Sequence, residues 1–123
     1  MDKDVLVAEA QSLIRWLDET RAKPRVAMWV YSSETDSWRL WIVPAEKIEK
    51  SDFFLILSDV ISKHRAEIPG FDIGMIDFKR ADHPAVKGLE KFVRMDGIGN
   101  VRMSQNYFNG FLLPEGIVLR AAV

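Results

Sequence analysis

The chain has 123 residues, of which 48% are hydrophobic and 28% charged, and its 17 basic and 18 acidic side chains leave a net charge of -1. This length suits one domain over residues 1–123, because two halves would each be too small to bury a good core. The absence of cysteine excludes disulfide frameworks, thiolate zinc sites, iron–sulfur clusters and cysteine catalysis. No third of the chain has an excess of basic side chains, so nucleic-acid binding is not expected.

The N-terminus and the apolar runs bear on where the protein is found. Residues 1–4 (MDKD) lack the basic start and the apolar stretch of a signal peptide. Uninterrupted apolar runs such as Phe53 to Leu57 are far shorter than the roughly 20 residues that span a bilayer. We therefore expect a cytoplasmic protein with no membrane partner.

The N-terminal half predicts a helix, a hairpin and a second helix. Apolar residues at helical spacing predict a helix over residues 4 to about 20, and Pro24 prevents its continuation. Alternating apolar residues then predict strands over 25–31 and 38–43, and the polar loop between them is typical of an antiparallel hairpin. Helical periodicity returns from Ser51, the expected N-cap, to about residue 66.

The C-terminal half predicts a strand, a helix and two further strands. Residues 71–78 (FDIGMIDF) are apolar on both faces, which predicts a strand inside the sheet. A third helix is expected to begin at Asp82, which can cap it. Short strands are expected at 101–105 and 117–123, the last at a sheet edge or paired with a second copy. The order αββαβαββ predicts a single α+β domain with three helices and a mixed, mostly antiparallel sheet of about five strands.

Three of the four tryptophans, Trp29, Trp38 and Trp41, fall on the predicted hairpin together with Tyr31. Both faces of these strands also carry large aliphatic side chains, so one face can pack on helices. If the other face stays open, its aromatic side chains would suit a protein partner or a stacked ligand. If helices cover both faces, the tryptophans are core residues. All four aromatic residues are candidates for partner binding.

Asp77 and Lys79 lie two positions apart at the end of the predicted third strand, so they point to the same face. A metal-dependent nuclease of the restriction-endonuclease-like kind uses such a pair, with the acid on the metal and the lysine near the attacked phosphate. About one acid-x-lysine triplet is expected by chance in a chain of this composition. The site would also need a further ligand, for which Asp72 and His83 are candidates, although His83 also suits a surface position at a helix start.

Other catalytic arrangements are not indicated. His64 lies on the apolar arc of the second predicted helix and is interpreted as a partly buried core residue. No Gly-x-Ser-x-Gly motif is present, and the two histidines do not have the spacing of metal ligands. Gly97 and Gly99 follow a helix instead of preceding one, which argues against nucleotide binding and for a helix C-cap and turn.

These patterns favour a non-catalytic protein-interaction module that binds a protein partner or itself, as a homodimer, through the aromatic hairpin or a strand edge. One alternative is a metal-dependent nuclease or phosphodiesterase that uses Asp77 and Lys79. Another is a domain that binds a small apolar ligand between sheet and helix, with Trp29 and Trp41 in the wall. No cofactor or metal is predicted.

Overall fold

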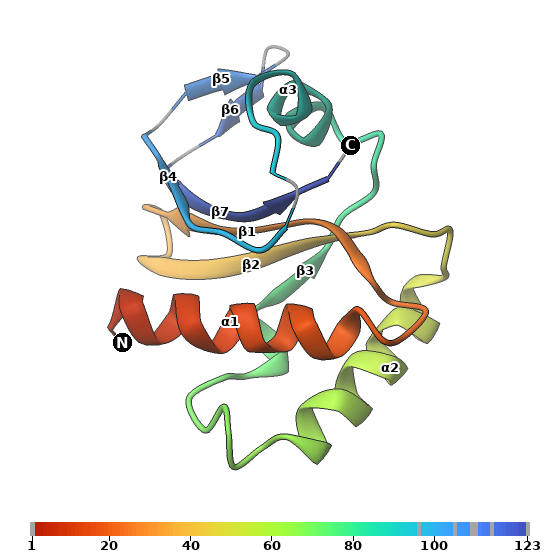
Figure 1. Ribbon diagram of the computed structural model, residues 1–123. Helices are drawn as coiled ribbons and strands as arrows, with labels where there is room; N and C mark the ends of the chain where they lie inside the picture. Colours follow the sequence, from red (N-terminus) through yellow and green to blue (C-terminus); the bar gives the residue numbers. More distant parts are fainter. Residues whose placement is uncertain (1, 96, 105, 109–110, 114, 123) are drawn as a thin grey trace.

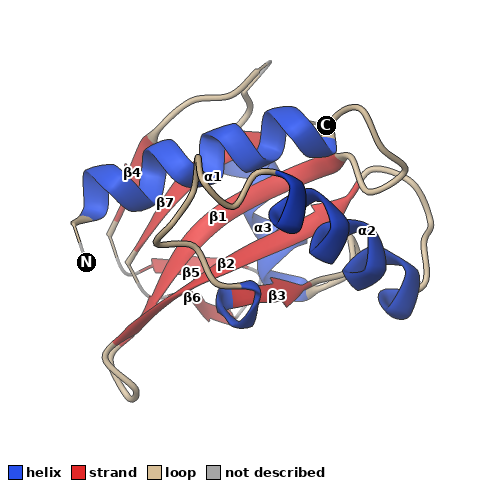
Figure 2. Cartoon of the chain, turned by 90° about the horizontal axis from the view of Figure 1, so that it is seen from below, coloured by secondary structure: helices blue, strands red, loops and turns tan. Residues whose placement is uncertain are grey.

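The computed structural model describes residues 2–95, 97–104, 106–108, 111–113 and 115–122. Within them, helices α1 and α2 lie together on one side of a twisted sheet, and α3 lies on the other (Figures 1 and 2). None of the helices in this part of the chain has the length and apolar character needed to cross a lipid bilayer. In chain order the elements are α1 (Lys3–Leu17), β1 (Pro24–Ser32), β2 (Ser37–Pro44), α2 (Lys50–Lys63), the 3-10 helix η1 (Ile73–Met75), β3 (Ile76–Phe78), α3 (Pro84–Phe92), β4 (Val101–Met103), β5 (Asn106–Phe108), β6 (Phe111–Leu113) and β7 (Gly116–Ala121).

Five strands form the main sheet in the order β3-β2-β1-β7-β4. β1 pairs antiparallel with β2 and β7, and β4 pairs antiparallel with β7. β2 and β3 run parallel and are joined through α2, because a parallel pair needs a crossover connection. β5 and β6, which the sequence did not predict, form a separate antiparallel pair. The predicted α+β fold, with three helices and a mixed five-stranded sheet, is confirmed.

The sheet separates two hydrophobic clusters because side chains alternate between its faces. Trp29 of β1 lies opposite Leu40 of β2, and both belong to the larger cluster beneath α1 and α2. Met28 lies opposite Trp41, and both belong to the smaller cluster beneath α3, with Leu89 of that helix. Helices therefore cover both faces of the aromatic hairpin.

The third predicted strand is shorter than expected and lies at an edge, not inside the sheet. Its first half forms a loop and η1, and β3 keeps three residues that pair with β2 alone. The apolar residues of 71–78 are not buried on the two faces of a central strand; several of them pack on one cluster of the core. Phe71, with 1% of its surface exposed, inserts from the loop into the larger cluster, and Ile76 joins that cluster from the strand.

The last strand is internal, not at an edge. β7 lies between β1 and β4 and is apolar on both faces. Ile117 and Leu119 enter the cluster beneath α1 and α2, and Val118 and Ala121 enter the cluster beneath α3. β7 therefore has the apolar residues on both faces that a central strand requires.

Two helices have N-caps other than the residues expected from the sequence. α2 begins at Lys50 with Glu49 as its N-cap, so Ser51 lies inside the helix. α3 begins after His83, whose imidazole occupies the capping position in place of Asp82. α3 ends at Phe92, so Gly97 and Gly99 do not cap it. Local residue preference therefore places these two helices in the chain but does not fix their terminal residues.

Trp29 is the side chain whose loss the fold should tolerate least. It is fully buried, and its indole Nε1 donates to the carbonyl of Leu6 in α1 at 3.2 Å. Trp29→Phe removes this bond and leaves a void, which should lower the free energy of unfolding by about 2 kcal/mol. Urea unfolding followed by far-UV circular dichroism measures the change.

Leu55→Ala is the control, because 70% of the Leu55 side chain is exposed. We expect this exposed substitution to change stability by no more than about 0.5 kcal/mol. Equal losses in the two variants would contradict the placement of Trp29 at the centre of the core.

Candidate ligand-binding site

The four hairpin aromatics are divided between the core and the surface. Trp29 has no exposed surface, and Trp41, which is 8% exposed, lies beneath α3. Tyr31 and Trp38 are partly exposed and pack against each other at the end of the hairpin, with ring centroids 5.3 Å apart. A partner that binds this hairpin would therefore meet Tyr31 and Trp38, not Trp29.

Asp77 is engaged by an arginine. Its carboxylate accepts hydrogen bonds from Arg39 Nη2 at 2.6 Å and from Arg39 Nε at 3.3 Å, and this pairing raises the pKa of the guanidinium. The ammonium of Lys79 lies 4.6 Å from the centre of the Trp41 ring. Among the described residues, no three histidine or carboxylate side chains are grouped so that they could hold a metal ion. Asp77, Asp72 and His83 are therefore not brought together as a metal centre.

His83 has a structural role at the start of α3. Its Nδ1 accepts a hydrogen bond from the backbone N–H of Ala85 at 3.2 Å, so the proton of the neutral ring lies on Nε2. The ring packs edge-on against Trp41, with centroids 5.4 Å apart. Burial and then the positive charge of Lys79 lower the pKa of His83, while Asp82 opposes this shift. Lys79, Trp41 and His83 thus form one contiguous group on the sheet face covered by α3.

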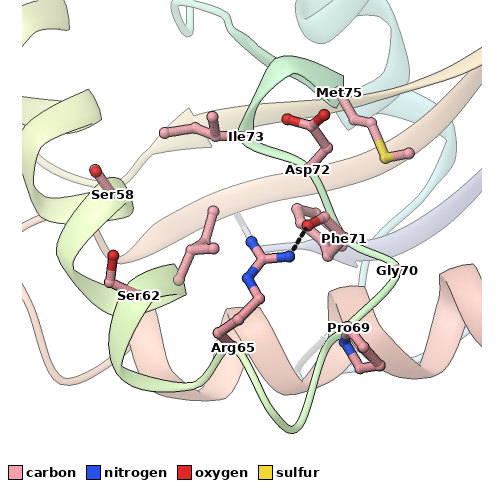
Figure 3. Close-up of a pocket in the computed structure, with 10 residues that line it drawn as sticks. Ser58, Ser62, Arg65, Pro69, Gly70, Phe71, Asp72, Ile73 and Met75 are labelled. Carbon is pink, nitrogen blue, oxygen red and sulfur yellow. Dashed lines mark hydrogen bonds between the residues drawn. The ribbon is translucent and has the colours of Figure 1, made fainter.

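A cavity of about 470 Å³ opens between the C-terminal half of α2 and the segment that leads through η1 to β3 (Figure 3). Its volume lies within the range of roughly 300–1,000 Å³ that is usual for small-molecule sites. The two walls come from segments joined by a tight turn, so they stay adjacent. The cavity is lined by Ser58, Ile61, Ser62, Arg65, Pro69, Gly70, Phe71, Asp72, Ile73 and Met75.

The cavity combines an apolar base with polar side chains. Ile61 and Phe71 are buried members of the larger hydrophobic cluster, and Ile73 and Met75 pack against it. The base of the cavity is therefore part of the close-packed core. Hydroxyl groups lie above it on α2, where Ser62 follows Ser58 by one helical turn.

Arg65 and Asp72 supply opposite charges from the two walls. Arg65 Nη1 donates to the carbonyl of Phe71 at 2.6 Å, and Asp72 Oδ1 accepts from the N–H of Gly74 at 2.8 Å. These backbone contacts fix both side chains and still leave guanidinium donors and one carboxylate oxygen for a ligand. In the part of the chain that the structure describes, neither charge has an ion-pair partner.

Two contacts with α1 hold the turn between α2 and η1, which forms one end of the cavity. His64 stacks on Trp16 of α1, with ring centroids 3.8 Å apart and planes within 8°, which anchors the end of α2. This agrees with the interpretation of His64 as a partly buried residue. The N–H of Gly70 points to Oε1 of the buried Glu9 at 3.4 Å. The cavity wall is thus attached to α1 by two contacts.

The polar residues of the cavity wall follow a pattern that is visible in the sequence. Ser58 and Ser62 lie one helical turn apart on the polar side of α2, and Arg65 follows the end of the helix, shortly before Pro69 and Gly70. Such a row normally indicates a solvated face. The contact of Phe71 with the core turns the following segment back onto this row, and no pattern in the sequence shows that return.

Comparison of the chain with models of protein families, with curated proteins and with solved structures finds no match. The function is therefore inferred from the chemistry of its own residues.

The lowered pKa of His83 should make stability depend on pH. Because the unfolded chain binds a proton at this position more readily than the folded protein, stability should be greatest above the ordinary value of 6.5 and decrease as the pH falls toward the folded-state pKa. His83→Asn keeps a capping side chain without a titrating one. Urea unfolding of the two proteins between about pH 7.5 and pH 5 should show a smaller pH dependence in the variant. Identical slopes would contradict the assignment.

Proposed function

We propose that the protein is a non-catalytic binding domain that takes up a small molecule in the cavity between α2 and η1. The observation that carries this proposal is the pair Arg65 and Asp72, two opposite charges held on facing walls above an apolar base. Groups of opposite charge that are fixed by other contacts lose little freedom when a ligand binds, so they favour binding.

The chemistry of the walls supports a zwitterionic ligand with an apolar body. The planar guanidinium of Arg65 matches a carboxylate, and the Asp72 carboxylate matches an ammonium group. Phe71 and Ile61 would contact the apolar part. A free amino acid with an aliphatic or aromatic side chain has this combination of groups.

The contacts around Asp77 argue against the nuclease alternative and so favour a binding function. A metal-bound carboxylate needs its oxygens for the ion, and Arg39 occupies both oxygens of Asp77. Lys79 is directed to the Trp41 ring.

Titration with L-leucine tests the proposal, with 3-methylbutylamine and 4-methylpentanoate as analogues that lack the carboxylate and the ammonium group. Amide chemical shifts from two-dimensional NMR should move for residues 58–75. Arg65→Gln and Asp72→Asn should each weaken leucine binding about tenfold, because each removes a charge-assisted hydrogen bond. Each analogue should bind more weakly than leucine.

Lys63→Gln is the matched control, because Lys63 is the last residue of α2, close to Arg65 in the chain, and pairs with Asp59 outside the cavity. This variant should bind leucine like the wild type. No shifts in residues 58–75 with leucine, or with L-methionine and L-phenylalanine, would refute the proposed ligand class.

Association through the end of the hairpin is a second candidate function. The paired register of β7 and β1 ends at Val30, with one further hydrogen bond from the Tyr31 N–H to the Glu115 carbonyl at 2.9 Å, and β3 pairs with β2 only from Leu40 to Ile42. The turn end of the β1–β2 hairpin projects beyond the other strands (Figure 2). Tyr31 and Trp38 are paired with each other near this end, one position before the last pair of the hairpin. Partly exposed tyrosine and tryptophan side chains are frequent anchors of protein interfaces, and we propose a second copy of the chain as the partner.

Sedimentation equilibrium tests this self-association. The wild type should show a mass above 14.1 kDa that increases with concentration. Trp38→Ser should raise the dimer dissociation constant about tenfold or more, whereas Leu55→Ser, which changes an exposed apolar residue on α2, should leave it unchanged. A monomeric wild type at every concentration would eliminate this candidate.

A further inference from the structure

The cavity between α2 and η1 is larger than a leucine molecule requires. A buried site of about 150 Å³ holds one benzene molecule, so each non-hydrogen atom of a ligand needs about 25 Å³. On this scale, the cavity volume of about 470 Å³ accommodates about 19 such atoms. Leucine, with nine, would fill roughly half of this volume, whereas tryptophan, with fifteen, would fill roughly four fifths. An amino acid with a bicyclic side chain therefore matches the cavity better than an aliphatic one.

The apolar surface of the cavity also suits an aromatic ring. Ile61 and Phe71 form its base, and Ile73 and Met75 line it beside them. The thioether of a methionine makes favourable contacts with aromatic rings, and its flexible side chain adapts to their flat shape. Burial of an indole ring against these side chains would remove more apolar surface from water than burial of a leucine side chain, which favours the larger ring.

Two hydroxyl groups provide an acceptor for the polar atom of an indole ring. Ser58 and Ser62 lie one turn apart on α2 and line the cavity (Figure 3). Within the described residues, neither hydroxyl forms a hydrogen bond with another group of the protein. A serine oxygen can accept a hydrogen bond from an indole N–H, and a buried indole usually has such an acceptor. The hydroxyls therefore favour indole over a purely apolar ring of similar size.

We propose that the cavity is a site for free tryptophan, with Ser58 and Ser62 as the residues that select the indole ring. This assignment rests on the proposed binding function, in which Arg65 and Asp72 hold the carboxylate and the ammonium group that free amino acids share. The remainder of the cavity then distinguishes the side chains. Its size and apolar surface favour tryptophan over leucine, and its hydroxyls favour tryptophan over an apolar bicyclic ring.

A dipeptide of two apolar residues would fill the cavity equally well but would not match its charges. Arg65 reaches the carbonyl of Phe71 at 2.6 Å, directly before Asp72 in the chain, so the two charges lie near each other. The ammonium and carboxylate of an amino acid are attached to one carbon, whereas an extended dipeptide spans about 7 Å. The charges therefore favour a single amino acid.

Two-dimensional NMR titrations with L-tryptophan, L-leucine, 3-(1-naphthyl)-L-alanine and L-leucyl-L-leucine test the proposal. Tryptophan should bind at least about tenfold more tightly than leucine, because its ring buries more apolar surface. It should bind about fivefold more tightly than naphthylalanine, whose ring has a similar size and no N–H. The dipeptide should bind more weakly than tryptophan.

The double variant Ser58→Ala/Ser62→Ala removes both hydroxyls, and it should fold because alanine favours a helix at least as well as serine. Its affinity for tryptophan should fall about fivefold, whereas its affinity for leucine should stay unchanged. Ser51→Ala is the matched control, because Ser51 lies on the same helix outside the cavity. This control should bind tryptophan like the wild type.

The outcomes separate this assignment from the proposed function. Equal affinities for tryptophan and leucine, or an unchanged affinity for tryptophan in the double variant, would overturn the tryptophan assignment and leave the amino-acid site in place. Tighter binding of the dipeptide than of tryptophan would overturn the assignment as well. No shifts in residues 58–75 with leucine and with tryptophan alike would refute the proposed function itself.

Discussion

The two-sided burial of β1 is the constraint on which the rest of the molecule depends. Ala27 and Trp29 face α1 and α2, whereas Val26, Met28 and Val30 face α3. A strand buried on both faces must have neighbours on both edges and a layer over each face, because its backbone groups and its side chains both need partners. β2, β7 and the helices meet these requirements. The bond from the Trp29 indole to Leu6 then joins α1 to the sheet.

Most of the polar and charged side chains that line the two recesses lie along the β2–α2–β3 crossover or just after it. The cavity with Arg65 and Asp72 lies where the chain returns from α2 to β3, and a second recess, lined in part by Ile48 and Phe78, lies where β2 and β3 end. Both recesses are therefore built by connecting segments on a buried sheet, which is where binding residues are concentrated in many proteins. The core supplies their apolar walls through Phe71 at one end and Ile48 at the other.

Elements with a strong local pattern could be predicted from the sequence. The periodicity of α1 and the alternation of β1 and β2 indicated a helix and a hairpin, and the structure confirms both. The prediction of an internal strand over residues 71–78 was wrong. Apolar residues on both sides of a segment have two physical causes: a central strand, or a loop that packs on the core. Of the candidate site residues, Lys79, His83 and Trp41 do lie together, but the partner of Asp77 is Arg39, which is distant in sequence.

The sequence by itself determined the fold class, the hairpin and the exclusion of thiol chemistry, since these follow from periodicity and composition. Only the tertiary structure decided which strand is central, which tryptophans are buried and where unpaired charges gather. The physical reason is that period and composition are properties of neighbouring residues, whereas burial and ion pairing depend on residues brought together by folding. Arg65 and Asp72 line one cavity only because Phe71 enters the core and the chain turns back along α2.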